Sequence, residues 1–105
     1  MAPGGALPDS AAFEPLVGDT FDLMAADERA SARLDSCTVH QHSASAESFT
    51  LVFTAPLAER PQQAIYGLEH PTLGALELFL VPVGVSDDGY QLEAVCNLVP
   101  TAQEA

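Results

Sequence analysis

The pattern of apolar and polar positions along the chain is most regular between Ser48 and Thr54. Phe49, Leu51 and Phe53 occupy every second position of this segment, and threonine or valine stands between them. Successive side chains of a β-strand point to opposite faces, so an alternation with a period of two predicts a strand with one buried face. We therefore expect the three apolar residues to share a face that packs in the core.

Several further segments have the length and composition of strands and are separated by residues that favour turns. Pro56 and Pro61 interrupt one connection, and Ser86-Asp87-Asp88-Gly89 forms another. About six strands without the crossover helices of a parallel sheet predict an all-β domain, a small, mostly antiparallel β-barrel or sandwich. Besides residues 48–54, the predicted strands are residues 20–24, 33–40, 64–69, 76–83 and 90–98.

Two of these segments depart from simple alternation. In the second predicted strand the alternation slips between Leu34 and Cys37, which predicts a β-bulge. Residues 76–83 are apolar on nearly both faces, with Glu77 as the exception, which predicts a strand that is central or covered on both sides. Pro82 is expected to mark the end of its ladder, because proline has no N–H to donate.

The chain has 105 residues, the size of one domain. Residues 1–12 are rich in Ala, Pro and Gly and are expected to form a mobile tail whose deletion leaves the melting temperature nearly unchanged. The single β domain is predicted to span residues 13–99, and residues 100–105 are expected to fray. Residues 25–32 favour helix by composition but have poor periodicity, so a helix and a loop or hairpin connection both remain open.

The charge of the chain is strongly negative, with 15 acidic residues against 3 basic ones and a formal net charge of −12. Phosphate backbones and anionic lipid headgroups require clustered cations, so we expect no nucleic acid and no membrane as a direct partner. No apolar run is long enough to span a bilayer and the N-terminus lacks the pattern of a signal peptide, which predicts a cytoplasmic protein. Cys37 and Cys96 are expected to be buried free thiols rather than a disulfide.

Longer motifs are spread over most of the predicted ordered region. These are FEPLVGDTF at residues 13–21, FTLVFTAP at 49–56, LEHPTLGALELFLVPVG at 68–84 and EAVCN at 93–97. Together they resemble the opening, the FxLxFxxP strand, the central motif and the closing EAVFN of a bacterial family that is catalogued as a domain of unknown function. The resemblance implies a short cytosolic protein, sometimes encoded near phage-tail or collar-type proteins, with no catalytic residues to carry over. Cys96 departs from the aromatic residue of the family at that position.

The candidate metal ligands are His40 and His42, which stand at i and i+2 on one face of a predicted strand end, where two imidazoles could hold zinc or copper. Cys37 could join them only if the suspected bulge turned its side chain to the same face. The alternative is a pair of solvated histidines. His70 could be a further ligand, but its position before Pro71 also suits an extended turn. No cofactor is predicted, because the glycine-rich phosphate loops and the nucleophile elbow are missing.

Gly67 is the basis of the candidate interaction site. A glycine inside a strand often marks a place where another backbone or a ligand approaches closely. The residues around it could line an apolar groove or an oligomer interface, with core packing as the alternative for most of them. The candidate residues are Tyr66, Gly67, Leu68, His70, Leu73 and Phe79.

These observations favour a non-enzymatic domain that acts through protein contacts, with an exposed edge strand as the means. The partner would be another protein, in a larger and phage-tail-like assembly, or a second copy in a homo-oligomer. The alternative hypothesis is a β-barrel that binds a small ligand or a metal through His40 and His42. An enzyme is the third hypothesis, but adjacency separates the side chains of Glu69 and His70, and no catalytic residue is predicted.

Overall fold

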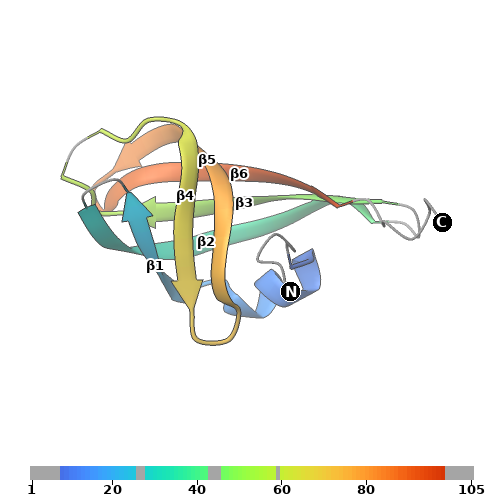
Figure 1. The fold of residues 1–105 in the computed structure, drawn as a ribbon. Coiled ribbons are helices and arrows are strands. Elements are labelled where there is room, and N and C mark those ends of the chain that lie inside the picture. Colours follow the sequence, from blue (N-terminus) through green and yellow to red (C-terminus); the bar gives the residue numbers. More distant parts are fainter. Residues whose placement is uncertain (1–7, 26–27, 43–45, 59, 99–105) are drawn as a thin grey trace.

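The fold is an all-β barrel of six antiparallel strands, which confirms the predicted fold class (Figure 1). The computed structural model describes residues 8–25, 28–42, 46–58 and 60–98. A short helix, α1 (Ser10–Phe13), and a 3₁₀ turn, η1 (Glu14–Leu16), precede the barrel. The strands are β1 (Thr20–Ala25), β2 (Glu28–His42), β3 (Glu47–Ala55), β4 (Ala64–His70), β5 (Gly74–Ser86) and β6 (Gly89–Leu98).

The strands close into a ring in the order β1-β2-β3-β6-β5-β4. Strand β5 serves two neighbours, because residues 74–80 pair with β4 and residues 81–86 pair with β6. Figure 1 shows β4 and the first part of β5 crossing in front of β2, β3 and β6. Among the described strands the ring closes through β5, but each half of β5 is paired on one side only, with β4 or with β6. The exposed strand edge that the sequence predicted is therefore left at these unpaired sides. The last part of β6 extends beyond the closed barrel, because β6 pairs with β3 as far as Leu98 but with β5 only as far as Glu93.

Strand β2 contains two irregularities, at Asp35 and His40, where its pairing with β3 skips one residue. The first of these confirms the bulge predicted from the slipped alternation. Because the extra residue restores the phase of the pleat, both Leu34 and Cys37 pair with inward-facing residues of β3. The hairpin between β1 and β2 pairs Ala25 with Glu28, so the hairpin alternative for this connection is the one adopted.

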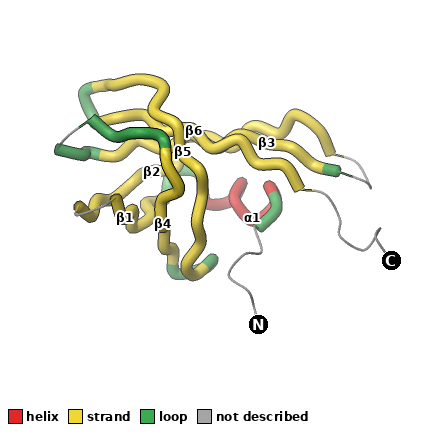
Figure 2. Tube along the Cα trace, turned by 45° about the horizontal axis from the view of Figure 1, so that its top comes forward, coloured by secondary structure: helices red, strands yellow, loops and turns green. Residues whose placement is uncertain are grey.

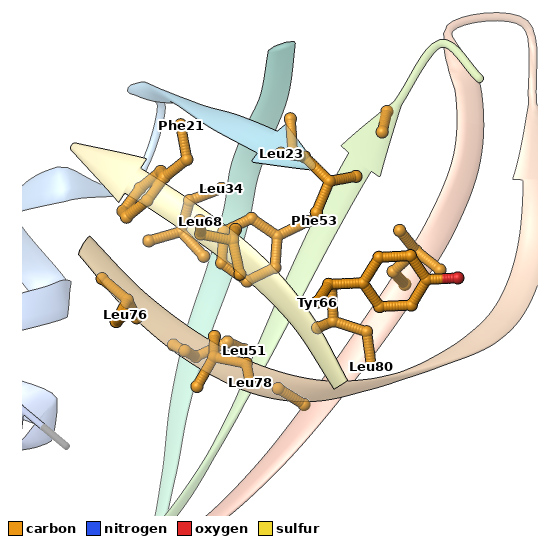
Figure 3. Close-up of a cluster of buried hydrophobic side chains, with 14 of the residues drawn as sticks. Phe21, Leu23, Leu34, Leu51, Phe53, Tyr66, Leu68, Leu76, Leu78 and Leu80 are labelled. Carbon is orange, nitrogen blue, oxygen red and sulfur yellow. The ribbon is translucent and has the colours of Figure 1, made fainter. Parts of the chain in front are cut away.

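Apolar side chains fill the interior of the barrel. Phe49, Leu51 and Phe53 are fully buried, which confirms the predicted shared face of β3. The ring of Phe21 from β1 meets the ring of Phe53 edge to face, with centroids 5.4 Å apart. Figure 3 shows side chains from β1 to β5 converging on this region. Further fully buried residues are Leu23, Leu34, Leu68, Leu80 and Leu92.

The expected end of the ladder at Pro82 is wrong. Strand β5 continues to Ser86, and its pairing with β6 shifts register between Pro82 and Gly84. Proline cannot donate to a ladder hydrogen bond, and the irregularity next to it is where a strand tolerates such a residue. The turn predicted after the strand is present, with Gly89 at φ 137°.

The N-terminal segment is ordered from before the predicted boundary at Phe13. Asp9 caps α1 by accepting a hydrogen bond from the Ala12 backbone N–H at 3.2 Å. Ser10 is buried, its hydroxyl donates to Glu47, and the ring of Phe13 lies 5.9 Å from that of Phe49. Figures 1 and 2 both place α1 beside the far part of β2 and β3. Residues 1–7 of the expected tail and residues 100–105 lie outside the described residues.

Candidate functional site

The outward-facing side of β4 and β5 carries exposed apolar side chains. Ile65 on β4 and Phe79 on β5 are direct cross-strand partners, so their side chains stand next to each other on the same face. Their exposed fractions are 67% and 52%. Val81, two positions further along β5, continues the apolar row and is partly buried. We call this side of the hairpin, together with the adjoining side of β1, the outer face.

Gly67 lies at the centre of the outer face. It pairs with Met24 of β1 on one side and with Glu77 of β5 on the other. Glycine has no side chain, so the surface is depressed between Met24 and Glu77. A hollow of about 350 Å³ lies there, with Met24, Gly67 and Glu77 in its lining. A Cβ atom at position 67 would stand 3.3 Å from Met24 Cε. The hollow therefore depends on the missing side chain.

The next row of the outer face is acidic. Asp22 of β1 and Glu69 of β4 are direct cross-strand partners and both are exposed. Like charges placed opposite each other destabilise a sheet. They lie in the lining of a second hollow of about 350 Å³, which shares Ala75 with the first. The sequence of β1, β4 and β5 contains no lysine or arginine, and the cations next to this face are Arg29 and Arg33 of β2, the cross-strand partners of Met24 and Thr20.

The six predicted interaction residues fall on different sides of the barrel wall. Tyr66, Leu68 and His70 point inward and are buried, and Leu73 packs against the core from the β4–β5 turn. Only Gly67 and Phe79 belong to the outer face. Ile65 and Met24 were not predicted as site residues, and they become neighbours of these two through the register of β4 with β5 and β1.

His70 has a structural position. Its Nδ1 accepts a hydrogen bond from the Thr72 backbone N–H at 3.0 Å, and its Nε2 lies 3.2 Å from Asp19 Oδ2. The acceptor role of Nδ1 requires the proton to sit on Nε2, which then donates to Asp19. The imidazole also packs against Phe21, with ring centroids 4.7 Å apart. These contacts tie the β4–β5 turn to the loop before β1.

The candidate metal ligands do not converge in the described part of the chain. Cys37 lies on the inner face of β2, whereas the exposed His40 has its Nε2 2.7 Å from the hydroxyl of Thr50. The side chain of His42 lies outside the described residues. Within those residues, the His, Cys, Asp and Glu side chains form no group of three that could hold a metal ion.

Both cysteines are free thiols, as expected from the sequence, but only Cys96 is buried and Cys37 is partly exposed. Burial raises the pKa of the Cys96 thiol from 9.0 to about 11, with a smaller contribution from the nearby Cys37. Burial, and then the negative charges of Glu14 and Glu47, also raise the pKa of Cys37. A raised pKa keeps a thiol protonated at neutral pH and therefore poorly nucleophilic. Neither side chain has the properties of a reactive cysteine.

Comparison with known proteins places most of the chain in one family model. Residues 8–96 match a model described as a domain of unknown function, DUF6916. This match confirms the resemblance to a family without an established activity. No curated protein and no solved structure matches the chain. Among the described residues, no helix combines the length and apolar character that crossing a membrane would require.

Proposed function

Since the chain belongs to the family DUF6916, which prescribes no activity, we propose from its surface that it is a non-enzymatic protein-interaction domain whose docking surface is the outer face. The observation that supports this proposal is the two-sided apolar character of β5. Its inward residues fill the barrel, and its outward Phe79 stands exposed beside Ile65. The sequence pattern predicted a strand covered on both sides. The described chain covers one side, and a partner would cover the other.

The energetics favour this assignment. Full burial of a large apolar side chain contributes about 1.5 to 3 kcal/mol, so covering the exposed halves of Ile65 and Phe79 would contribute on the order of 1 kcal/mol each. Apolar and aromatic residues that become fully covered at the centre of an interface dominate binding energy. The acids beside them would form the polar rim. The proposed partner is a protein of a larger assembly, such as a phage-tail-like structure, or a second copy of the chain.

The two free cysteines suit a reducing compartment, and the proposed location is the cytoplasm. The function would then be that of a small accessory subunit that contributes a rigid surface rather than a reaction.

The test uses three forms of the purified chain, wild type, Phe79→Ser and Val95→Ser. Val95 lies on β6 and is also exposed, so its substitution removes an apolar group of the surface outside the proposed site. Each form is analysed by size-exclusion chromatography with light scattering and used to capture proteins from lysate of the native host. We expect an oligomer or a bound partner with wild type and Val95→Ser, and its loss with Phe79→Ser. Equal behaviour of the two variants would refute the proposal.

A second candidate function rests on a hollow beside the irregular stretch of β5 at Pro82 to Gly84. The hollow has a volume of about 420 Å³, with the exposed Arg60 together with Val83, Val85 and Tyr90 in its lining. A cation beside aliphatic side chains suits a small carboxylate with an apolar tail. Octanoate should then raise the melting temperature of wild type and not of Arg60→Gln. No rise with wild type would remove this candidate.

A further inference from the structure

We infer that the partner of the outer face is a basic protein segment, one that places an arginine or lysine side chain in the hollow at Gly67 and an apolar side chain on the Ile65–Phe79 pair. This inference rests on the proposed function, because it specifies the chemistry of the occupant of the same surface. It is drawn from the shape, the apolar content and the charge of three adjacent cross-strand rows, which are Asp22–Glu69, Met24–Gly67–Glu77 and Ile65–Phe79.

The hollow at Gly67 matches a long cationic side chain. Met24 offers a thioether and methylene wall, Gly67 leaves the floor without a side chain, and Glu77 places a carboxylate on the opposite wall. Lysine and arginine bury their methylene stems along apolar surface and keep the charged group in a polar environment. A stem over Gly67 beside Met24 would bring the charged group to Glu77 on one side.

The charges around the outer face determine which sign of charge a partner should carry. The Asp22–Glu69 pair lies one row beyond Gly67, and Glu93 pairs with Val81 beyond the apolar row, so carboxylates border the apolar residues on both ends. The net charge of the whole chain, −12, adds a long-range field of the same sign. Arg29 of β2, the cross-strand partner of Met24, offsets one of these charges, and an incoming cation would offset the carboxylates that remain in excess, Asp22, Glu69 and Glu77 against one arginine.

The same arrangement argues against a second copy as the occupant. In a two-fold symmetric dimer the same patch meets itself. Glu77 and the Asp22–Glu69 pair of each subunit would then approach their own counterparts, three carboxylates on each copy beside the single Arg29 of β2, because Arg33 is paired with Asp35 and Asp88. Like charges brought together at an interface cost several kcal/mol. A basic partner avoids this cost.

Phe79 strengthens the choice of a protein over a small polycation. It lies two positions from Glu77 on the same face of β5, so an arginine seated near Gly67 could also approach the aromatic ring. A polyamine would satisfy the carboxylates but would leave Ile65 and Phe79 uncovered. A peptide segment with alternating basic and apolar side chains meets both requirements, because alternate residues of an extended chain point to the same side.

The test measures binding of fluorescently labelled short peptides to the full chain by anisotropy, at low and at physiological salt. The first peptide alternates arginine with leucine, the second replaces each arginine by glutamate, and the third replaces each leucine by serine. The protein forms are wild type, Glu77→Gln, Gly67→Val, Phe79→Ser and the control Asp87→Asn. Asp87 lies in the β5–β6 turn, so the control has the same net charge as Glu77→Gln and separates a local effect from the overall field.

We expect the arginine–leucine peptide to bind wild type and Asp87→Asn equally. Neutralising Glu77 should weaken binding about two- to fivefold, the range of an exposed ion pair. Phe79→Ser should weaken it about tenfold, as for a residue at the centre of an interface. Gly67→Val should weaken it without any change in charge, because the added side chain fills the hollow. Circular dichroism melts show whether each variant remains folded.

Other outcomes overturn the inference in distinguishable ways. If the glutamate–leucine peptide binds as well as the arginine–leucine peptide and Phe79→Ser abolishes both, the outer face is a docking surface but its partner is not basic. If the arginine–serine peptide binds equally to all protein forms, the attraction is the general field alone. If none of the peptides binds while wild type forms a dimer that Phe79→Ser disrupts, the occupant is a second copy. If none binds and no dimer forms, the outer face does not bind a basic segment. Capture from lysate with wild type, Phe79→Ser and Val95→Ser then tests the proposed function separately.

Discussion

The hydroxyl of Thr54 on β3 donates a hydrogen bond to the carboxylate of Asp35, the residue that forms the first bulge of β2. The other oxygen of this carboxylate lies 2.7 Å from Arg33 Nε, and the Arg33 guanidinium also approaches Asp88 of the β5–β6 turn at 3.5 Å. The bulge is therefore held to the neighbouring strand β3 and, through Arg33, to the turn that leads into β6, the next strand of the ring.

Replacing Asp35 by alanine should lower the free energy of unfolding by about 1 to 2 kcal/mol, because the buried hydroxyl of Thr54 loses its acceptor. Thr54→Val removes the donor with little change in shape and should cost less, about 1 kcal/mol. Urea denaturation measures both. The exposed Asp87→Ala is the control, and a cost for Asp35→Ala no larger than that of the control would show that the bulge does not need this contact.

The inner and outer faces of the barrel should respond differently to the same substitution. Phe53 is fully buried against Phe21, so Phe53→Ala should cost about 3 to 5 kcal/mol of stability. Phe79→Ala removes the same atoms from an exposed position and should cost less than about 1 kcal/mol. Chemical denaturation of the two variants gives the comparison. A loss below about 1 kcal/mol at Phe53 would contradict the register of β3.

The repulsion between Asp22 and Glu69 predicts a stabilising substitution. Asp22→Asn should raise the free energy of unfolding by about 0.5 kcal/mol at low salt, and the gain should shrink as salt screens the charges. Thermal melts at two salt concentrations measure it, with Asp87→Asn as the charge-matched control. The same variant should weaken binding of the arginine–leucine peptide. The stability of the chain and its affinity for the peptide would then change in opposite directions. If Asp22→Asn stabilised the chain no more than the control, the effect would come from the net charge and not from repulsion between Asp22 and Glu69.

The contact of Ser10 with Glu47 predicts that the N-terminal helix contributes to stability. Ser10→Ala should lower the free energy of unfolding by about 1 kcal/mol, because it removes a partly buried hydrogen bond to a carboxylate. Deleting residues 1–12 should lower the melting temperature by more, in contrast to the expectation from sequence composition. Differential scanning calorimetry compares these forms with Ala11→Ser, an exposed change in the same helix. An unchanged melting temperature after the deletion would restore the view of a free tail.

The raised pKa of Cys96 predicts a loss of stability at alkaline pH. The thiol has a pKa of about 11 in the folded chain against 9.0 without burial, so between these values the unfolded chain releases a proton that the folded chain retains. Stability therefore falls as pH rises from 9 toward 11, by on the order of 2 kcal/mol in total, and is unaffected by this group below that window. Cys96→Ala should show a shallower decline over the same range in urea titrations. Parallel declines would assign the effect to other groups.

The sequence predicted the local elements well and their mutual placement poorly. The alternation of Phe49, Leu51 and Phe53 and the slip before Cys37 are local signals, and each identified its strand or bulge. Pro82 predicts the end of a ladder because proline has no N–H to donate, whereas the pairing of β5 with β6 continues past it to Ser86. The Ala-, Pro- and Gly-rich composition around Ser10 predicts a tail, whereas the partner of Ser10, Glu47, is 37 positions away in the sequence.

The candidate site depended on the register, which local patterns do not encode. Gly67 and Phe79 could be selected as unusual, but alternation alone places Tyr66 and Leu68 on the face opposite to Gly67. The neighbours Ile65 and Met24 join the site because β4 pairs with β5 at one offset and with β1 at another. The sequence can therefore suggest that β5 has two apolar sides. It cannot say which residues of other strands border the uncovered one.

The division of β5 between two ladders has a consequence for how this surface meets a partner. Residues 74–80 are held by β4, residues 81–86 are held by β6, and β4 in turn is held by β1. The backbone at Gly67 is paired on both sides, with Met24 and Glu77, and the backbone at Phe79 is paired with Ile65 of β4. This part of the surface therefore has little conformational freedom to lose on association. A template of this kind binds with a small entropic penalty and selects partners that already fit, instead of reshaping itself around them.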